Sequence, residues 1–491
     1  MILFNKKKKR LWPYFILVFF LLLIAAGFWT YRWLINLDPI EIWNNQTVRN
    51  YIDKNIVGEE KKLVDLLPDL LGLNEPKNYL LLFLNNTELR PGGGFIGSYA
   101  VVNVNKGAVE ILKVEGTEIL DRNTPADWQP AAPSVLTDHL GVDKWYFRDS
   151  NWSPDFMESS KKGLEFYQGE RGLSADKIDL VAGVTPTVLE KIMEIIGPVT
   201  IDGITFTAED VTEKLEYEVE YGFVDKDLSP KERKQIMEPF AKMVSAKIKQ
   251  TMLTNLNQYV DLASDLIEEK QIMFYSPQAD LQKKLSELNL TGEVSPAVGD
   301  YLMWVDANLA ALKTDLAIDR TLSYSFFKNE EGKLVARASM NYQHQGKFDW
   351  RTTRYRTYAR VFVPEGSELI SVEGAVKNDQ SKLPGTVDMG TDLDRQWFGA
   401  FIAIEPGETG VLTFTYLLPE SISKQIEDGL YTLFVQKQLG AVDHALTLHL
   451  NFDKTIRSAS MAEEPDEWGN GSYVLKTDLR VDRSFSINLS S

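Results

Sequence analysis

Residues 85–97, NNTELRPGGGFIG, place an arginine and a run of glycines among several polar side chains. An arginine can bind an oxyanion through its planar fork of N–H groups, and glycine amides can add an anion-binding nest. In the alternative interpretation, the glycines allow a tight connection between strands and the arginine pairs with an acid. The ligand-binding candidates in this loop are Asn85, Asn86, Glu88, Arg90, Gly93 and Gly94.

The glycine spacing also satisfies the dinucleotide pattern G-x-G-x-x-G, through Gly92, Gly94 and Gly97. That pattern requires the glycines to open a helix, and a P-loop requires a lysine followed by serine or threonine. The residues that follow, FIGSYAVVNV, are strand formers, and no such lysine appears. The loop is therefore predicted to connect two strands without binding a nucleotide.

A second polar group lies in residues 147–156, FRDSNWSPDF. Ser153 is expected to cap a helix that has Pro154 at its first position, and a helix N-terminus beside an arginine can hold an anion. The alternative is a capped helix whose loop is closed by an Arg–Asp pair. The candidates here are Arg148, Asp149 and Asn151, with Asp149 as the one metal-ligand candidate.

A third group lies in residues 305–315, VDANLAALKTD. Asp306 and Asn308 carry oxygen ligands, but two are too few for a calcium site. Asn308 and Lys313 are retained as ligand-binding candidates, against the alternative of a turn with a solvated lysine. Further along the chain, three arginines are expected on one solvated strand face, paired with acids: Arg354, Arg356 and Arg360.

Composition excludes several classes of site. The chain has no cysteine, so disulfides, thiolate metal sites and a cysteine nucleophile are absent. His139 is the only histidine before residue 318, and no Ser-His-Asp triad can be assembled. A net charge of −17 disfavours nucleic acid as a partner, because phosphate binding depends on Lys and Arg.

The first residues predict a membrane anchor. Five basic residues precede an apolar run, and 11–35 is long enough to span a bilayer, with Trp and Tyr near both ends. A cleaved signal peptide is the alternative. We expect a cytoplasmic basic tail at 1–10, a single transmembrane helix at 11–35 and a juxtamembrane helical stalk at 36–74. The expected location is the plasma membrane, with the N-terminus cytoplasmic and the body extracytoplasmic.

The body is predicted to contain two domains. Residues 75–317 alternate between strand and helix patterns, which indicates an extracytoplasmic α/β domain. The strands include 78–84 and 178–184, and TPTVLEKIMEIIG predicts a helix with Thr185 as its N-cap. Residues 318–491 contain short strand-like runs separated by turns, which predicts an all-β sandwich domain.

Several motifs together resemble a bacterial family of membrane-anchored extracytoplasmic proteins, domain-of-unknown-function family 4012. They include NNTELRPGGGFIGSY, RDSNWSPDF, VTPTVLEKIMEIIGPV and DANLAALKTD. Residues 89–199 are more distantly similar to the LytR-CpsA-Psr family of cell-wall glycopolymer transferases, which implies an α/β sandwich. In that family, arginines and aspartates bind a lipid-linked pyrophosphate and its metal. Arg90 matches the first arginine loosely, but the aspartate after it is missing and VEGTE replaces the second motif.

These observations favour a cell-envelope protein that binds a surface glycan or a polyprenyl-phosphate-linked glycan, without a defined enzymatic activity. One alternative is a glycopolymer transferase of LytR-CpsA-Psr type, acting on a polyprenyl-pyrophosphate-linked glycopolymer. Arg90 and Arg148 would then clamp phosphates, Asp149 would act as base or metal ligand, and Mg²⁺ would be the cofactor. The other alternative is a structural or adhesive surface protein without a small ligand.

Overall fold

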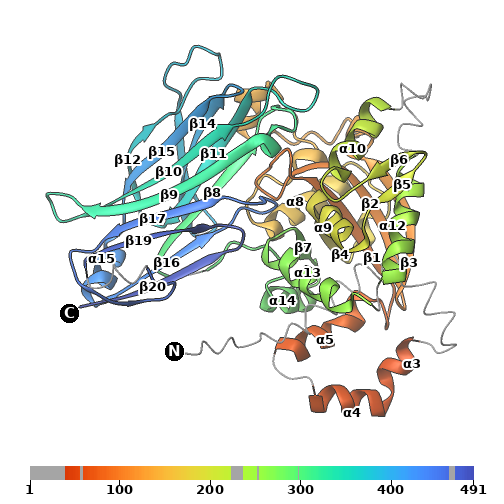
Figure 1. The fold of residues 1–491 in the computed structure, drawn as a ribbon. Helices are drawn as coiled ribbons and strands as arrows, with labels where there is room; N and C mark the ends of the chain where they lie inside the picture. Colours follow the sequence, from red (N-terminus) through yellow and green to blue (C-terminus); the bar gives the residue numbers. More distant parts are fainter. Residues whose placement is uncertain are drawn as a thin grey trace. The chain divides into compact units, whose positions relative to one another are not determined.

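The computed structural model describes residues 39–490, except 56–58, 223–235, 252–253, 297 and 464–469. The chain forms two compact units that alternate along the sequence (Figure 1). The first unit takes in the described residues up to Phe83, together with Ser98–Ile119 and Arg171–Thr291. The second takes in Leu84–Gly97, Leu120–Glu170 and the chain from Gly292 onward. Sequence patterns placed a single domain boundary at 317/318, whereas these units are interleaved.

A five-stranded mixed sheet, in the order β3-β2-β1-β4-β7, organises the first unit. The strands β1 and β4 pair in parallel, while β2 with β3 and β4 with β7 pair antiparallel. A separate hairpin is formed by β5 and β6. The bounds are β1 (Lys77–Asn85), β2 (Phe95–Asn105), β3 (Ala108–Gly116), β4 (Leu180–Val184), β5 (Val199–Ile201), β6 (Ile204–Phe206) and β7 (Ile272–Tyr275).

Helices supply most of the remaining core of the first unit, where apolar residues of α5, α9, α12, α13 and α14 pack with the sheet strands. The helix α6 (Thr117–Arg122) runs across the boundary between the units. The other bounds are α3 (Pro39–Asn44), α4 (Gln46–Asn55), α5 (Glu59–Leu70), η2 (Ala175–Lys177), α9 (Pro186–Ile196), α10 (Val211–Tyr217), η3 (Glu218–Gly222), α12 (Met237–Thr251), α13 (Leu256–Glu268) and α14 (Ala279–Glu287).

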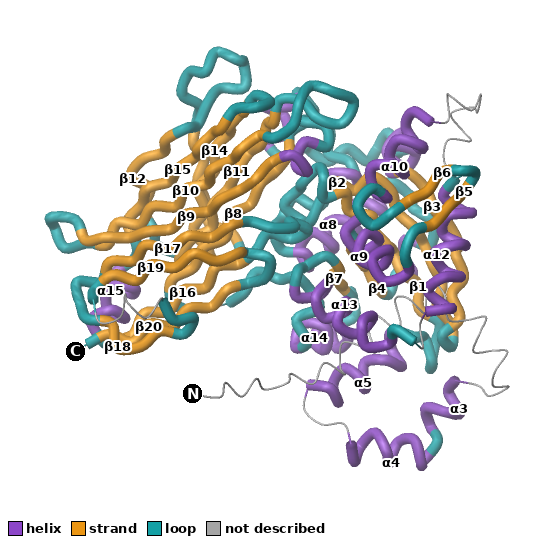
Figure 2. Tube along the Cα trace, in the orientation of Figure 1, coloured by secondary structure: helices purple, strands orange, loops and turns teal. Residues whose placement is uncertain are grey.

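Two larger sheets form most of the second unit, in which strands outnumber helices (Figure 2). The six-stranded sheet has the order β12-β15-β10-β9-β17-β19, and the seven-stranded sheet has the order β13-β14-β11-β8-β16-β20-β18. The bounds are β8 (Asp300–Asn308), β9 (Ile318–Lys328), β10 (Leu334–His344), β11 (Tyr355–Pro364), β12 (Glu368–Glu373), β13 (Val387–Asp392), β14 (Arg395–Ile404), β15 (Thr409–Leu417), β16 (Leu430–Gln436), β17 (Ala445–Asn451), β18 (Ile456–Ala459), β19 (Ser472–Asp478) and β20 (Arg483–Leu489).

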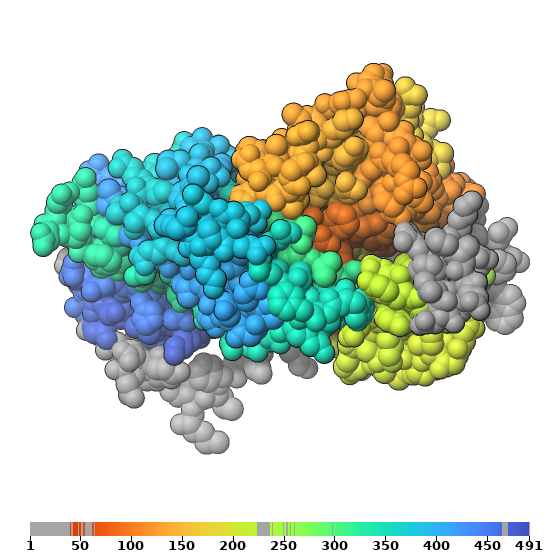
Figure 3. Space-filling view, turned by 90° about the horizontal axis from the view of Figure 1, so that it is seen from above, coloured from red at the N-terminus to blue at the C-terminus, as the bar shows by residue number. Residues whose placement is uncertain are grey.

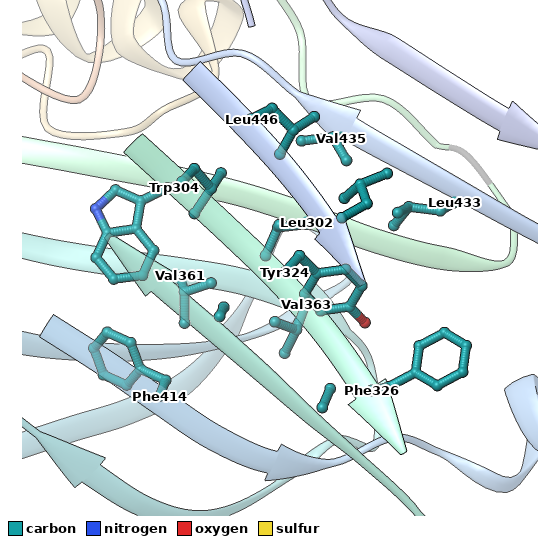
Figure 4. Packing of buried hydrophobic residues seen from close by; sticks show 14 of the residues in the cluster. Leu302, Trp304, Tyr324, Phe326, Val361, Val363, Phe414, Leu433, Val435 and Leu446 are labelled. Carbon is teal, nitrogen blue, oxygen red and sulfur yellow. The ribbon is translucent and has the colours of Figure 1, made fainter. Parts of the chain in front are cut away.

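The two sheets share one apolar core, because alternate residues of each strand point inward. Leu302 and Trp304 of β8 pack there with Tyr324 and Phe326 of β9 and with Phe414 of β15 (Figure 4). Short helices complete the unit: α7 (Ser134–Leu140), η1 (Phe147–Asp149), α8 (Phe156–Gly169), η4 (Thr314–Ala317) and α15 (Glu420–Glu427).

The prediction of a mixed α/β protein with a β-rich C-terminal part is confirmed. The strand expected at 78–84 is β1, and the glycine loop leads into β2 and not into a helix. The helix predicted after Thr185 begins at Pro186 and ends before Gly197, which has φ 71°. Thr185 is its N-cap, but its hydroxyl lies 2.6 Å from Gln271 Oε1 and does not cap the helix backbone.

The predicted membrane topology requires a correction. Across the residues that the structure describes, no helix combines the length and apolar character needed to cross a bilayer. The predicted tail and span, residues 1–10 and 11–35, lie outside those residues. On this finding, the assignment to the plasma membrane as a single-pass protein is corrected.

Candidate functional site

The glycine loop is a tightly closed connection between β1 and β2. The Glu88 amide donates to the Asn85 carbonyl at 3.1 Å, and the Gly93 amide donates to the Arg90 carbonyl at 3.1 Å. Gly94 has φ 145°, and a Cβ there would lie 2.6 Å from the Asn85 carbonyl. Glycine is therefore required by turn geometry and close backbone approach. Because the Gly93 amide is already bonded within the turn, it does not form an open anion nest.

Arg90 lies at the centre of this loop with 4% of its surface exposed. Its Nε is 3.2 Å from Asp149 Oδ1, and its Nη2 is 3.3 Å from Glu88 Oε1. Its Nη1 donates to the carbonyls of Asn308 at 2.7 Å and Leu89 at 3.3 Å. All three guanidinium nitrogens thus have protein acceptors, and two carboxylates neutralise the charge.

Arg148 continues this chain of charges toward the surface. Its Nε lies 3.6 Å from Asp149 Oδ2 and 3.4 Å from Asp121 Oδ2, and about a third of its side chain (35%) is exposed. Asp149 is therefore held between Arg148 and Arg90. The predicted residues Arg90, Arg148 and Asp149 do come together, but each of the two cations faces carboxylates and not an empty site.

A buried carboxyl pair at the end of the chain of charges was missed by sequence reasoning. Asp121 and Glu170 are 6% and 2% exposed, and the Phe147 amide donates to Glu170 Oε1 at 2.8 Å. Burial and the neighbouring Glu170 raise the pKa of Asp121 to about 8, although Arg148 opposes the shift. Burial also raises the pKa of Glu170. Such a pair retains a proton at neutral pH.

This arrangement cannot attract a phosphate ligand by charge. Four carboxyl groups, those of Glu88, Asp149, Asp121 and Glu170, surround two arginines. Burial raises the pKa of Glu88, although Arg90 and Lys313 oppose the shift. The cluster can hold protons and fix backbone segments, which is the behaviour of a structural network.

The predicted asparagines brace the same loop. Asn151 donates from Nδ2 to the Gly94 carbonyl at 2.7 Å, and its own carbonyl accepts the Gly92 amide at 3.0 Å. Asn86 donates to the Gly440 carbonyl at 3.0 Å. The Asn85 carboxamide oxygen accepts from the amide and hydroxyl of Thr87, at 3.1 and 2.7 Å. These contacts occupy the side-chain amide groups of Asn151 and Asn86 and the side-chain oxygen of Asn85, whereas Asn151 Oδ1 is buried without a hydrogen bond.

Asp306 and Asn308 are also occupied internally. Asp306 pairs with Arg320 Nε at 3.0 Å and accepts from the Tyr342 hydroxyl at 2.7 Å. Asn308 donates from Nδ2 to Asp315 Oδ2 at 2.7 Å. In the described part of the chain, no group of three or more His, Asp or Glu residues is arranged to hold a metal. Their oxygens serve a buried hydrogen-bond network at β8.

Two local predictions are wrong. The helix after residue 153 is capped by Asp155, whose Oδ1 accepts the Glu158 amide at 3.0 Å, and α8 begins at Phe156. Ser153 instead accepts the Asp155 amide from within the preceding turn. Arg360 is not solvated, because only 7% of it is exposed, and it does not pair with an acid in the described residues. Two of the three aromatic rings around it, those of Trp152 and Trp397, come from distant segments, which explains why the pattern misled.

Comparison with known proteins gives a family match over part of the chain and no activity. Residues 74–219 match the model of a family described as "Protein of unknown function (DUF4012)". No curated protein gives a match.

Solved structures show only weak likeness. A Legionella pneumophila protein described as nutrient binding has a TM-score of 0.23 at 9% identity, over 39% of this chain and 72% of that chain. Saccharomyces cerevisiae leukotriene A4 hydrolase has a TM-score of 0.20 at 8% identity, over 35% of this chain and 28% of that chain. A two-domain M1 zinc metallopeptidase has a TM-score of 0.18 at 12% identity, over 35% of this chain and 43% of that chain. These likenesses are too weak to assign a function.

Proposed function

We propose that this protein binds a glycan and does not transfer it. The observation that carries the proposal is a group of three half-buried aromatic side chains within eight residues of the chain, 145–152: Trp145, Tyr146 and Trp152. We call this group the aromatic ledge. Residues 120–170, orange to amber in Figure 3, form part of the molecular surface. Aromatic rings with one exposed part suit saccharides, whose C–H faces stack on rings while their hydroxyls bond polar groups.

Cations hold the rings of the aromatic ledge in place. Lys162 Nζ lies 5.7 Å from the Trp145 ring centroid, and the Arg148 guanidinium lies 5.2 Å from that of Tyr146. The Trp145 indole also donates to the Asp149 carbonyl at 2.8 Å. Cation–π contacts of this kind restrict ring orientation. A ring fixed before binding loses less entropy when a ligand stacks on it.

The transferase alternative, in which the chain acts like LytR-CpsA-Psr proteins, is weaker. It requires Arg90 to clamp a pyrophosphate, but its three nitrogens already contact Asp149, Glu88 and two carbonyls. Releasing a buried arginine from two carboxylates is costly, because the guanidinium would lose both acids, and Asp149 and Glu88 would be left with the weaker attraction of Arg148 and Lys313. We therefore expect no phosphate release when the protein meets a polyprenyl-pyrophosphate-linked saccharide and Mg²⁺. Turnover lost in Arg90→Lys would instead support the transferase.

The binding proposal is tested with immobilised polysaccharides and the full chain. Trp145→Ala and Tyr146→Ala should each weaken retention about tenfold, since a stacking contact contributes roughly 1–3 kcal/mol by analogy with base stacking. Tyr217→Ala is the matched control, because Tyr217 is also exposed (39%) but belongs to the first unit. Retention unchanged in both ledge variants would favour a structural or adhesive protein without a saccharide ligand.

A further inference from the structure

Arg360 lies on β11 in a cage of aromatic rings. Its guanidinium carbon is 5.8 Å from the Trp152 ring centroid, 5.3 Å from that of Phe362 and 5.9 Å from that of Trp397. Its Nη2 donates to the Trp152 carbonyl at 2.8 Å. On the neighbouring strand β14, the residue opposite is Gly399, which adds no side chain.

Arg360 differs from two of the other buried arginines of the second unit. Arg90 and Arg320 are 4% and 7% exposed, and each pairs with two carboxylates. Arg360 is equally buried at 7% exposure, yet among the described residues its guanidinium has one hydrogen bond and no carboxylate ion pair. A guanidinium offers five donors, so most of its capacity is unused.

The environment of Arg360 disfavours its charge without removing it. Burial lowers the pKa of Arg360 to about 10, although Tyr358 and Asp392 oppose the shift. The side chain is still cationic near neutral pH. A desolvated charge without a counter-ion is unfavourable, and an incoming anion would relieve that penalty.

We infer that Arg360 is the anion-binding residue of the glycan site, and that it binds the carboxylate of a uronic-acid saccharide. This inference rests on the proposed glycan-binding function, because Trp152 belongs to both the cage and the aromatic ledge. A sugar unit stacked on the ledge would carry its C6 carboxylate to the remaining donors of Arg360. The ligand class is therefore an acidic polysaccharide and not a neutral one.

A carboxylate fits this position better than a phosphate. Rings face the guanidinium from three residues, so the approach to its donors is confined. A planar carboxylate can meet the planar fork edge-on through two parallel hydrogen bonds. A tetrahedral phosphate exposes further oxygens, which would lie against the electron-rich faces of the aromatic rings.

The test compares polyuronates with their methyl esters, which remove the charge and keep the sugar. The probes are polygalacturonate, alginate and hyaluronate, each beside its carboxyl-methylated form, titrated into the full-length protein by calorimetry. At least one polyuronate should bind about tenfold or more tightly than its own ester, as expected for a charge-assisted hydrogen bond. The preference should persist at high salt, because a desolvated contact is little screened and the chain as a whole carries −17.

Substitution then assigns the preference to one side chain. Arg360→Met should bring the ratio of acid to ester affinity down to about one, and Arg360→Lys should retain part of the preference for the acid. Arg356→Met is the matched control on the same strand, since Arg356 donates to the Ala310 carbonyl and is not caged. Thermal melting checks that each variant is folded, and the comparison of acid with ester in the wild type does not depend on any variant.

The outcomes separate the two proposals. Equal binding of every acid and its ester would overturn the inference about Arg360 while leaving glycan binding intact. Binding of a poly(glycerol phosphate) chain in preference to every polyuronate would overturn the carboxylate assignment. Failure of all six polymers to bind would overturn both the inference and the proposed function.

Discussion

The shared proton of Asp121 and Glu170 predicts how the stability of the second unit changes with pH. Burial and mutual repulsion raise the pKa of Asp121 from 3.8 to about 8 in the folded protein. Between these values the folded state binds more protons than the unfolded state. The stabilisation is therefore complete at acidic pH and is lost as pH rises toward 8. The substitution Asp121→Asn keeps the size of the side chain and removes this titration.

The expected magnitude follows from linkage. One excess proton in the folded state changes the free energy of unfolding by about 1 kcal/mol for each pH unit. From pH 5 to pH 8, the free energy of unfolding of Asp121→Asn should therefore rise by a few kcal/mol relative to that of the wild type. The rise is smaller if Glu170 titrates in the same range in the variant. The gain should be greatest at pH 8, where repulsion between the two ionised carboxylates is otherwise strongest.

Urea denaturation followed by tryptophan fluorescence at half-unit steps of pH measures this difference. Asp300→Asn is the control. Burial raises the pKa of Asp300 to about 6, although the hydroxyls of Tyr324 and Tyr431 oppose the shift, so this substitution should change stability at lower pH than Asp121→Asn does. Curves for wild type and Asp121→Asn that stay parallel from pH 5 to pH 8 would refute the shared proton.

Three further substitutions test the structural roles of the loop and its neighbours, each by urea denaturation. Arg90→Met removes the buried cation that pairs with Glu88 and Asp149 and should cost about 3–5 kcal/mol, whereas Arg337→Met, in an exposed pair, should cost under about 1 kcal/mol; equal losses would contradict the buried network. Gly94→Ala should cost about 1–3 kcal/mol through strain and close approach, and an unchanged midpoint would refute that geometry. Asp155→Ala removes the cap of α8 and should cost about 1–2 kcal/mol; no loss would show that the cap is dispensable.

Local structure could be predicted from the sequence where short-range chemistry decides it. Strand β1 was predicted from a continuous apolar run, and the ends of α9 were predicted from Pro186 and Gly197. Both signals come from residues that are neighbours in the sequence. The glycine loop was also predictable as a strand connection, since strand formers follow it. Periodicity and turn chemistry operate over a few residues, so one chain is enough to read them.

The candidate site was predictable only in part, because its character depends on contacts between distant segments. Polar residues near Arg90 and Asp149 were found as separate motifs, but their mutual neutralisation was not. Asp121 and Glu170 lie far apart in the sequence and belong to no common motif, and an acidic chain offers many other Asp and Glu residues. Arg360 was expected to be solvated because, of the three rings around it, Phe362 lies on its own strand but Trp152 and Trp397 come from distant segments.

The interleaving of the two units has a consequence for how the chain can fold during synthesis. Residues 84–97 and 120–170 leave the ribosome well before the strands from Gly292 onward with which they form a compact unit. We expect these early segments to wait, incompletely packed, until the last sheet is made. A fragment that begins at residue 318 would lack β8, which lies between β11 and β16 in its sheet. We expect this fragment to be insoluble when it is expressed alone.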